Sequence, residues 1–352
     1  MSKPKICLIY TGGTIGMVDK GKGDGLEPPE NPDDFLKMAP DLEDIVDFDF
    51  VNLLNKDSTN MNPNDWVKMA NAVYDRRDMG YKGFVIAHGT DTMHFSSSAL
   101  AFAFGKNLNF PIVFTGAQTP PNVNHGDARI NLLRACKVAI ENIAEVVISF
   151  GDFVFRGCRV QKKDERRFDA FESPAFYPIG YISDIISITP FTKYQKTSYD
   201  SSINYRPYFS KGIVQITLIP GLEYKLILPI IKSNYCEGII LQSFGAGNLP
   251  YFDNEYSFIP IIETAKDKNI PTIITSQFPG HSTSATNYKA GLLAHEAGAI
   301  PTGNMTSAAA TVKFRWVLAD ILQNIKIGKI NSSEKIYSVK KAMENIYVGE
   351  MD

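Results

Sequence analysis

Cysteine is scarce in this chain, and its scarcity argues against two classes of site. The 352 residues include four cysteines, which stand far apart: Cys7, Cys136, Cys158 and Cys236. No CxxC pair and no Cys/His cluster is present, so the sequence predicts neither a zinc site nor a redox dithiol. We expect all four side chains to be buried, reduced thiols.

Long apolar runs and an excess of charge are also missing. No run approaches the roughly 20 apolar residues that a membrane helix needs, and the stretch MSKPKICLIY lacks the apolar segment of a signal peptide. We therefore expect a cytoplasmic protein. The net charge is −2, with 36 Lys and Arg against 38 Asp and Glu, which offers no electrostatic footprint for nucleic acid or a membrane. The expected partner is a small molecule or another protein.

Short apolar runs alternate with longer stretches of helical period, which predicts βα units around a parallel sheet. The predicted strands of a larger N-terminal doubly wound α/β domain with a mostly parallel sheet are KICLIY, FVNLLN, GFVIAHG, PIVFTGA and EVVISFG. The helices expected between them include NPNDWVKMANAVYDRR and GDARINLLRACKVAIEN. The first should begin with Asn62 as N-cap and Pro63 as its first residue. Its expected buried face consists of Trp66, Met69, Ala70 and Val73.

A polar stretch without periodicity, rich in Ser and Tyr, interrupts this pattern from about residue 190. It predicts three segments: an N-terminal domain at 1–191, a linker at 192–211 and a smaller C-terminal α/β domain at 212–352. The predicted strands of the C-terminal domain are GIVQITLIPG, EGIILQSFGAGN and IPTIITSQFPG. Its predicted helices are LEYKLILPIIKSN, SFIPIIETAKDKN and MTSAAATVKFRWVLADILQN.

Most of the apolar strands run into short polar loops. These loops are YTGGT, NKDSTN, AHGTDT, FTGAQT and QSFGAGN. Ligands of open α/β sheets bind outside the carboxyl ends of the strands, so the loops should converge on one crevice. The stretch MVDKGKGDGLEPPE after the first loop is either a mobile flap or a surface connection without function.

The first loop, TGGTIG, has two interpretations. It matches neither GxxxxGK[ST] nor GxGxxG, so a phosphate loop is the weaker one. As a nucleophile loop it offers the hydroxyl of Thr14, which needs a base and oxyanion stabilisation nearby. Thr11 is expected to end the strand, and the glycines to leave a substrate room against the backbone.

The loop HGTDTM also has two interpretations. Thr90 or Asp91 caps the following helix, or both bring polar groups to the crevice. His88 is expected to pack in the core. A third loop could hold both ends of a zwitterion through Asp57, Ser58 and Thr59.

TGGTIG and HGTDTM resemble the two signature motifs of the bacterial-type L-asparaginases, which are threonine-dependent amidohydrolases, and in particular their cytoplasmic type I branch. Further segments follow in family order: DSTNMNPNDW, FTGAQ, GDARINLL, RGCRVQKKDERRFDAF and QSFGAGN. The resemblance covers nearly the whole chain.

The resemblance implies that Thr14 attacks the side-chain amide carbon of L-asparagine, that ammonia leaves, and that water hydrolyses the acyl-enzyme to L-aspartate. It leaves room for a weak glutaminase activity. Thr90, Asp91 and Lys162 match a second triad, in which a lysine held near neutrality acts as a base. Backbone N–H groups at Thr90 and near Ala117 suit an oxyanion hole. No metal or organic cofactor is implied.

The family's substrate-binding residues match Asp57, Ser58, Thr59, Ala117 and Asn248. Ser58, with the backbone on either side of it, corresponds to the group that grips the α-carboxylate. Asn248 corresponds to a residue contributed by the partner of a homodimer or homotetramer, because family sites lie between subunits. The family's flap tyrosine has no counterpart here, and Leu26 stands about where it is expected. Because RVQK and Phe278 depart from allosteric type I relatives, we expect no activation by asparagine.

Other readings remain open at this point. A catalytically impaired amino-acid-binding sensor would keep the same pocket, although such proteins usually lose one of the four catalytic matches. The amidotransferase component that feeds ammonia to a tRNA-linked synthesis carries an extra domain before the first motif, whereas the first strand here is expected to begin by about Lys5. A nucleotide-binding protein is the third reading.

Overall fold

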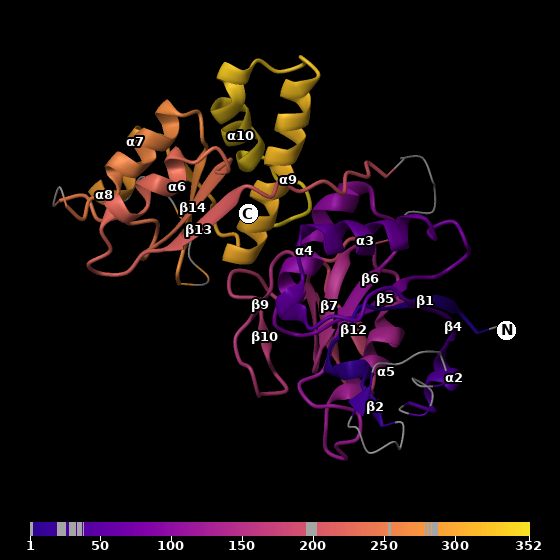
Figure 1. The fold of residues 1–352 in the computed structure, drawn as a ribbon. Coiled ribbons are helices and arrows are strands. Elements are labelled where there is room, and N and C mark those ends of the chain that lie inside the picture. Colours follow the sequence, from indigo (N-terminus) through magenta and orange to yellow (C-terminus); the bar gives the residue numbers. More distant parts are fainter. Residues whose placement is uncertain are drawn as a thin grey trace. The chain divides into compact units, whose positions relative to one another are not determined.

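The chain divides into two compact units, Met1–Pro207 and Tyr208–Asp352 (Figure 1). The computed structural model describes residues 3–19, 26–27, 33, 37, 39–194, 203–252, 255–278, 280, 283 and 288–352. Most of the predicted flap lies outside these ranges, apart from the antiparallel pair β2 (Val18–Asp19) and β3 (Leu26–Glu27). Within these ranges, no helix is both long and apolar enough to cross a membrane.

An eight-stranded sheet is formed by described residues of the first unit, in the order β12-β11-β8-β7-β6-β5-β1-β4. Neighbouring strands from β4 to β7 are parallel, whereas β8, β11 and β12 continue the sheet antiparallel. The bounds are β1 Lys5–Tyr10, β4 Asp47–Asn52, β5 Phe84–Ala87, β6 Ile112–Thr115, β7 Val146–Phe150, β8 Phe153–Arg156, β11 Gly180–Ile182 and β12 Ile186–Ile188. The predicted mostly parallel sheet is confirmed, and its antiparallel edge was not predicted.

Helices cover both faces of this sheet. α3 (Pro63–Tyr74) and α4 (Met93–Phe104) lie along one face, and α2 (Leu42–Ile45) and α5 (Ala128–Val138) along the other (Figure 1). The predicted start of α3 is confirmed, since Asn62 forms a capping box with Asp65. Its predicted buried face is confirmed as well, at Trp66, Met69, Ala70 and Val73. The shorter elements of the unit are η1 Thr14–Gly16, η2 Ser58–Asn60, η3 Gly105–Asn107, β9 Gln161–Lys162 and β10 Phe171–Glu172.

The second unit is a smaller α/β structure built on parallel strands in the order β13-β14-β15-β16. Its strands are β13 Ile213–Thr217, β14 Gly238–Ser243, β15 Thr272–Ser276 and β16 Ile300–Pro301. Its helices are η4 Tyr224–Leu226, α6 Leu228–Lys232, α7 Ile259–Asp267, α8 Lys289–Ala297, α9 Ser307–Lys326, η5 Ser332–Glu334 and α10 Lys335–Glu344. The single helix predicted over LEYKLILPIIKSN is wrong, because η4 and α6 divide that stretch and Pro229 stands in the first turn of α6.

The cysteines behave largely as expected. All four are free thiols, and Cys7, Cys136 and Cys158 are buried, whereas Cys236 is partly exposed. Burial raises the pKa of Cys7 to about 11 and also raises the pKa of Cys136. These two thiols therefore stay protonated at neutral pH and act as small apolar side chains.

Candidate active site

The polar loops after β1, β4, β5 and β6 pack directly on one another. An added Cβ at Gly89 would lie 2.8 Å from the side chain of Ser58, and one at Gly116 would lie 2.5 Å from the carbonyl oxygen of His88. Such close approach leaves space for hydrogen atoms alone. The predicted convergence of the loops on one another is therefore confirmed for the first unit, whereas the crevice between them stays a prediction. QSFGAGN belongs to the second unit.

The two glycines of TGGTIG have a different role from the one predicted. Gly12 and Gly13 have φ values of 117° and 87°, a region that favours glycine. A Cβ at Gly12 would lie 2.0 Å from the carbonyl oxygen of Lys56, and one at Gly13 would lie 2.5 Å from the Cα of Gly89. The expected room for a substrate is thus wrong for both glycines, because neighbouring backbone already occupies it.

The two threonines of this loop differ in their environment. Thr11 follows β1 directly and is fully buried, and its hydroxyl donates to the carbonyl oxygen of Ala87 at 2.9 Å. Thr14 begins η1 and is partly exposed, and its hydroxyl makes no hydrogen bond to any residue in the described ranges. Thr11 thus holds the loop to β5, whereas the hydroxyl of Thr14 has no hydrogen-bond partner among the described residues.

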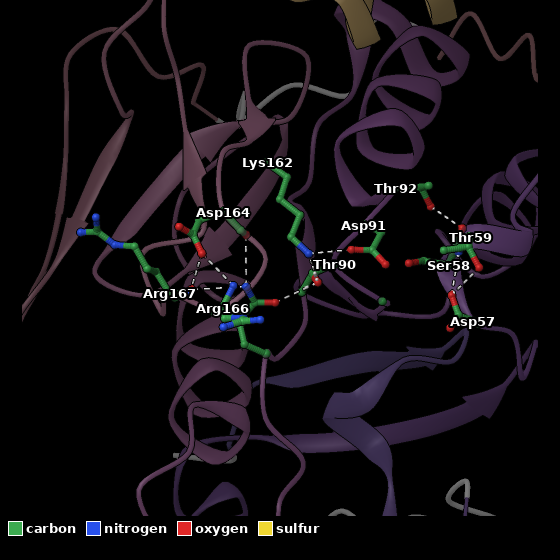
Figure 2. A network of polar contacts seen from close by, with 12 residues as sticks. Asp57, Ser58, Thr59, Thr90, Asp91, Thr92, Lys162, Asp164, Arg166 and Arg167 are labelled. Atoms are coloured by element: carbon green, nitrogen blue, oxygen red, sulfur yellow. Dashed lines mark hydrogen bonds and ion pairs between the residues drawn. The ribbon is translucent and has the colours of Figure 1, made fainter.

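Thr90, Asp91 and Lys162 form a connected group at the ends of β5 and β9 (Figure 2). The Lys162 ammonium donates to Thr90 Oγ1 at 2.8 Å and to Asp91 Oδ1 at 2.6 Å. The side chain of Lys162 is 12% exposed and that of Asp91 is 53% exposed. The tertiary structure therefore brings Lys162 to two adjacent residues that lie 72 and 71 positions before it in the chain.

The capping interpretation of HGTDTM is wrong. α4 begins at Met93 with Thr92 as its N-cap, and no side-chain cap bond is made there. Thr90 and Asp91 precede that N-cap and interact instead with Lys162. Thr90 and Asp91 therefore belong to the loop between β5 and α4, where they contact Lys162 of β9 and do not cap the helix.

Gln118 completes this group and was not singled out from the sequence. Its side-chain oxygen accepts from Thr90 Oγ1 at 3.0 Å, and its side-chain nitrogen donates to the carbonyl oxygens of Asp164 and Arg167 at 3.3 Å each. Its backbone N–H donates to the carboxylate of Asp127 at 3.0 Å. The Thr90 hydroxyl is thereby oriented, because it donates to Gln118 and accepts from the lysine. The segment FTGAQT predicts a polar loop, but the hydrogen bonds of Gln118 to Thr90, Asp164 and Arg167 join segments that are distant in sequence.

The loop at Asp57 to Thr59 forms the adjoining wall. Asp57 Oδ1 accepts from both the backbone N–H and the hydroxyl of Thr59 at 2.8 Å each. These bonds, the backbone one first, lower the pKa of Asp57. Ser58 beside it is 3% exposed. The Asp57 carboxylate therefore shapes this loop from within, and the hydroxyl of Ser58 lies buried beside it.

His88 is a packing residue, as predicted. Its Nδ1 lies 2.6 Å from the carbonyl oxygen of Gly89, so Nδ1 carries the proton, and Nε2 accepts from the Ser96 hydroxyl at 2.9 Å. Burial lowers the pKa of His88 to about 4. The imidazole is therefore neutral and fully bonded beneath the loop that carries Thr90.

Ala117 and Asn248 occupy separate units. Ala117 is buried directly after Gly116, at the end of β6. Asn248 closes a tight turn in the second unit, where its N–H donates to the carbonyl oxygen of Phe244 at 2.8 Å. GAGN is thus an ordered turn with a partly exposed Asn side chain.

Known proteins share this architecture over both units. A model of the asparaginase N-terminal domain matches residues 5–193, and a model of the glutaminase/asparaginase C-terminal domain matches residues 213–330. The L-asparaginase of Thermococcus kodakarensis is 30% identical over 349 residues, which is 99% of each protein. Its solved structure superimposes with a TM-score of 0.86, at 29% identity and 99% coverage of both chains.

Two further relatives extend the comparison. L-asparaginase I of Vibrio cholerae has a TM-score of 0.83 and 28% identity, with both chains covered completely. A glutamyl-tRNA(Gln) amidotransferase component of Methanosarcina mazei is 31% identical over 323 residues, which is 90% of this chain and 74% of that protein. Because domain models match both units and relatives share the fold over almost its full length, this chain belongs to the asparaginase family.

Proposed function

We propose that this protein hydrolyses L-asparagine to L-aspartate and ammonia through an acyl-enzyme on Thr14. The observation that carries the proposal is the Lys162 ammonium, 2.8 Å from Thr90 Oγ1 and 2.6 Å from Asp91 Oδ1. These groups lie among the same converging loops as the hydroxyl of Thr14. Relatives named L-asparaginase that match over almost the full chain add support.

In the acylation step, Thr14 Oγ1 attacks the side-chain amide carbon, and its proton passes through the Thr90 hydroxyl to the amine of Lys162. The carbon–nitrogen bond then breaks, and the nitrogen takes up that proton and leaves as ammonia. The negative oxygen of the tetrahedral intermediate needs N–H donors. The N–H groups of Thr90 and Ala117 suit this role, since neither donates to an acceptor within the described residues.

In the deacylation step, water attacks the ester carbon and the Thr14 oxygen leaves with a proton. In this step as well we assign the base to the amine of Lys162, with Thr90 as the hydroxyl that relays the proton. Asp91 then stabilises the ammonium that forms, through the close ion pair. In the resting state the Thr90 proton points to Gln118 Oε1, and for the relay it turns to the amine of Lys162.

Substrate binding is assigned to the neighbouring loop. Ser58 and the backbone of Asp57 and Thr59 hold the α-carboxylate, and Asp91, whose side chain is half exposed, is available to the α-ammonium. Asn248 of the partner subunit completes the site in a homodimer or homotetramer. We place the protein in the cytoplasm, where its four free thiols stay reduced.

The proposal is tested by ammonia release from L-asparagine, L-glutamine and D-asparagine. We expect the purified protein to prefer L-asparagine over L-glutamine by about 10- to 200-fold, the range that one methylene supplies. Thr14→Ala and Thr90→Val should abolish most of the activity, whereas the control Thr11→Ser, which keeps its hydroxyl on β5, should retain it. No release by wild type, or full activity in Thr14→Ala, would overturn the mechanism. Binding of asparagine without turnover would favour the impaired sensor.

The relatives named as glutamyl-tRNA(Gln) amidotransferase components favour a second candidate, a protein that supplies ammonia to a tRNA-linked synthesis. The same assay separates the two functions. Ammonia release by this chain alone supports the hydrolase, whereas release that depends on added glutamyl-tRNA(Gln) and a further protein supports the amidotransferase.

A further inference from the structure

We propose that Thr92 is a positioning residue that sets the preference for L-asparagine over L-glutamine, by fixing Ser58 relative to Thr90 and Asp91. The inference rests on the proposed function, because it concerns the same substrate. It assigns a task to the last threonine of HGTDT, which the mechanism above does not use.

The hydroxyl of Thr92 donates to the carbonyl oxygen of Ser58 at 2.7 Å (Figure 2). A threonine at an N-cap ordinarily accepts a hydrogen bond from the first turn of its own helix. Thr92 is the N-cap of α4 but makes no such bond. Its hydroxyl instead joins the loop after β5 to the loop after β4.

Ser58 is held by that β5 loop at a second point. Gly89 packs against the serine so closely that a Cβ there would lie 2.8 Å from Ser58 Oγ. The carbonyl oxygen that accepts from Thr92 also accepts from Met61 N–H at 3.1 Å. Ser58 is therefore seated against the two residues that flank Thr90 and Asp91 in the chain.

Other bonds of the β4 loop act elsewhere. Asp57 and Thr59 bond to each other within the loop, and Lys56 Nζ pairs with Asp65 of α3 at 2.8 Å. These contacts shape the loop and hold its start. The hydroxyl of Thr92, by contrast, ties the carbonyl oxygen of Ser58 to the loop after β5, which carries Thr90 and Asp91.

The preference for L-asparagine over L-glutamine follows from a fixed distance between the carboxylate-binding residue and the reacting hydroxyls. Ser58 is assigned to the α-carboxylate, and the reacting hydroxyls act on the side-chain amide. L-Glutamine places one more methylene between these groups than L-asparagine does. A rigidly held Ser58 therefore fits a substrate side chain of one length. If Ser58 can move, it binds the α-carboxylate of asparagine less tightly and discriminates less against glutamine.

The test compares Thr92→Val with Thr92→Ser. Thr92→Val keeps the shape but removes the donor, so we expect the KM for L-asparagine to rise about tenfold, which equals about 1.4 kcal/mol. We expect a kcat close to wild type and a clearly smaller ratio of kcat/KM between asparagine and glutamine. Thr92→Ser retains the donor and should restore both quantities.

Thr192→Val is the matched control. Thr192 is buried whereas Thr92 is partly buried, and like Thr92 it donates its hydroxyl to a backbone carbonyl of the same unit, that of Ile179 at 3.1 Å. This control should leave KM and the substrate ratio unchanged even where its melting temperature falls. An unchanged KM and ratio in Thr92→Val would overturn the inference, as would a loss of kcat alone or a Thr92→Ser variant that behaves like Thr92→Val.

Calorimetric binding of L-aspartate and L-glutamate separates this inference from the proposed function. Both ligands carry the same α-carboxylate, so Thr92→Val should weaken L-aspartate binding and narrow the ratio of the two dissociation constants. A wild type that binds L-aspartate but releases no ammonia counts against the hydrolase alone, and the ratio still decides the role of Thr92. A wild type that binds neither ligand overturns both.

Discussion

Each unit of this protein contains a close lysine–carboxylate pair, and the two pairs differ in burial. Lys313 Nζ lies 2.7 Å from Glu350 Oε1 in the second unit, and both side chains are 0% exposed. Lys162 and Asp91 in the first unit are 2.6 Å apart, with side chains 12% and 53% exposed. Similar distances therefore occur in a dry core and at an open loop.

The partners of the two lysines explain the difference. Lys313 also donates to the carbonyl oxygens of Met343 and Asn345 at 2.9 and 2.7 Å. Glu350 in turn accepts from backbone N–H groups at Tyr347 and Val348. Carbonyl oxygens cannot give up a proton, so this pair holds the C-terminal segment in place.

Lys162 has a partner of another kind. It donates to the hydroxyl of Thr90, a group that can both give and take a proton. Its carboxylate partner is open to a ligand. The chemistry and accessibility of the partners, more than the ion pair itself, therefore separate the lysine that we propose to react from the structural one.

The largest expected effect is on activity. Lys162→Met should lower kcat by about 10²- to 10⁴-fold, the usual contribution of a general base. The melting temperature should change little, because a partly exposed pair contributes only about 0–1 kcal/mol. Ammonia release and thermal denaturation measure the two quantities. A variant with near wild-type kcat would remove Lys162 from the mechanism.

The next largest effect is on stability. Lys313→Met should lower the free energy of unfolding by about 3–5 kcal/mol, because Glu350 would remain as an uncompensated buried charge. The folded fraction should keep its kcat. The double variant Lys313→Met/Glu350→Leu should recover part of the loss, as measured by denaturant unfolding. Equal stability of Lys313→Met and wild type would contradict the structural role.

A third experiment measures how the free energy of unfolding depends on pH through His88, the buried imidazole beneath the loop that carries Thr90. The pKa of His88 is about 4 in the folded protein against an ordinary value of 6.5, so the unfolded chain binds a proton that the native state excludes. This contribution is complete above about pH 6.5 and is lost as the pH falls toward 4, with a slope of about 1.4 kcal/mol per pH unit. His88→Gln should reduce the slope by that amount. Identical slopes in both proteins would contradict this assignment.

The smallest effect is expected for the neighbouring lysine. Lys163 pairs with Asp169 at 3.2 Å, and the two side chains are 33% and 41% exposed. Lys163→Met should change the free energy of unfolding by about 0–1 kcal/mol and leave kcat unchanged. If Lys163→Met lowered kcat as strongly as Lys162→Met, the positive charge at these two neighbouring lysines would matter more than the contact of Lys162 with Thr90.

The parallel part of the fold was predictable because it leaves a strong local pattern. The KICLIY run became β1 (Lys5–Tyr10), and the capping signal at Asn62 began α3. The antiparallel edge left a weaker signal, since β11 and β12 have three residues each. Such short strands depend on pairing with their neighbours rather than on periodicity.

The site divides in a similar way. Thr14, Thr90 and Asp91 stand in compact motifs, so their residue types and loop positions were visible in the sequence. Lys162 was identified by resemblance alone, because no local rule connects it to residues about 70 positions away. Gln118 was missed, since its importance comes from the three segments that it joins.

The sequence by itself determined the family, the parallel α/β units and the polar loops at the strand ends, because periodicity and short motifs are local properties. Only the tertiary structure decided what those loops do to one another. Neighbouring backbone fills the space that Gly12 and Gly13 were expected to leave for a substrate. Thr90 and Asp91 bond to Lys162 instead of capping a helix, and the hydroxyl of Thr92 donates to the carbonyl oxygen of Ser58. These outcomes depend on distances between segments remote in the chain, which only folding sets.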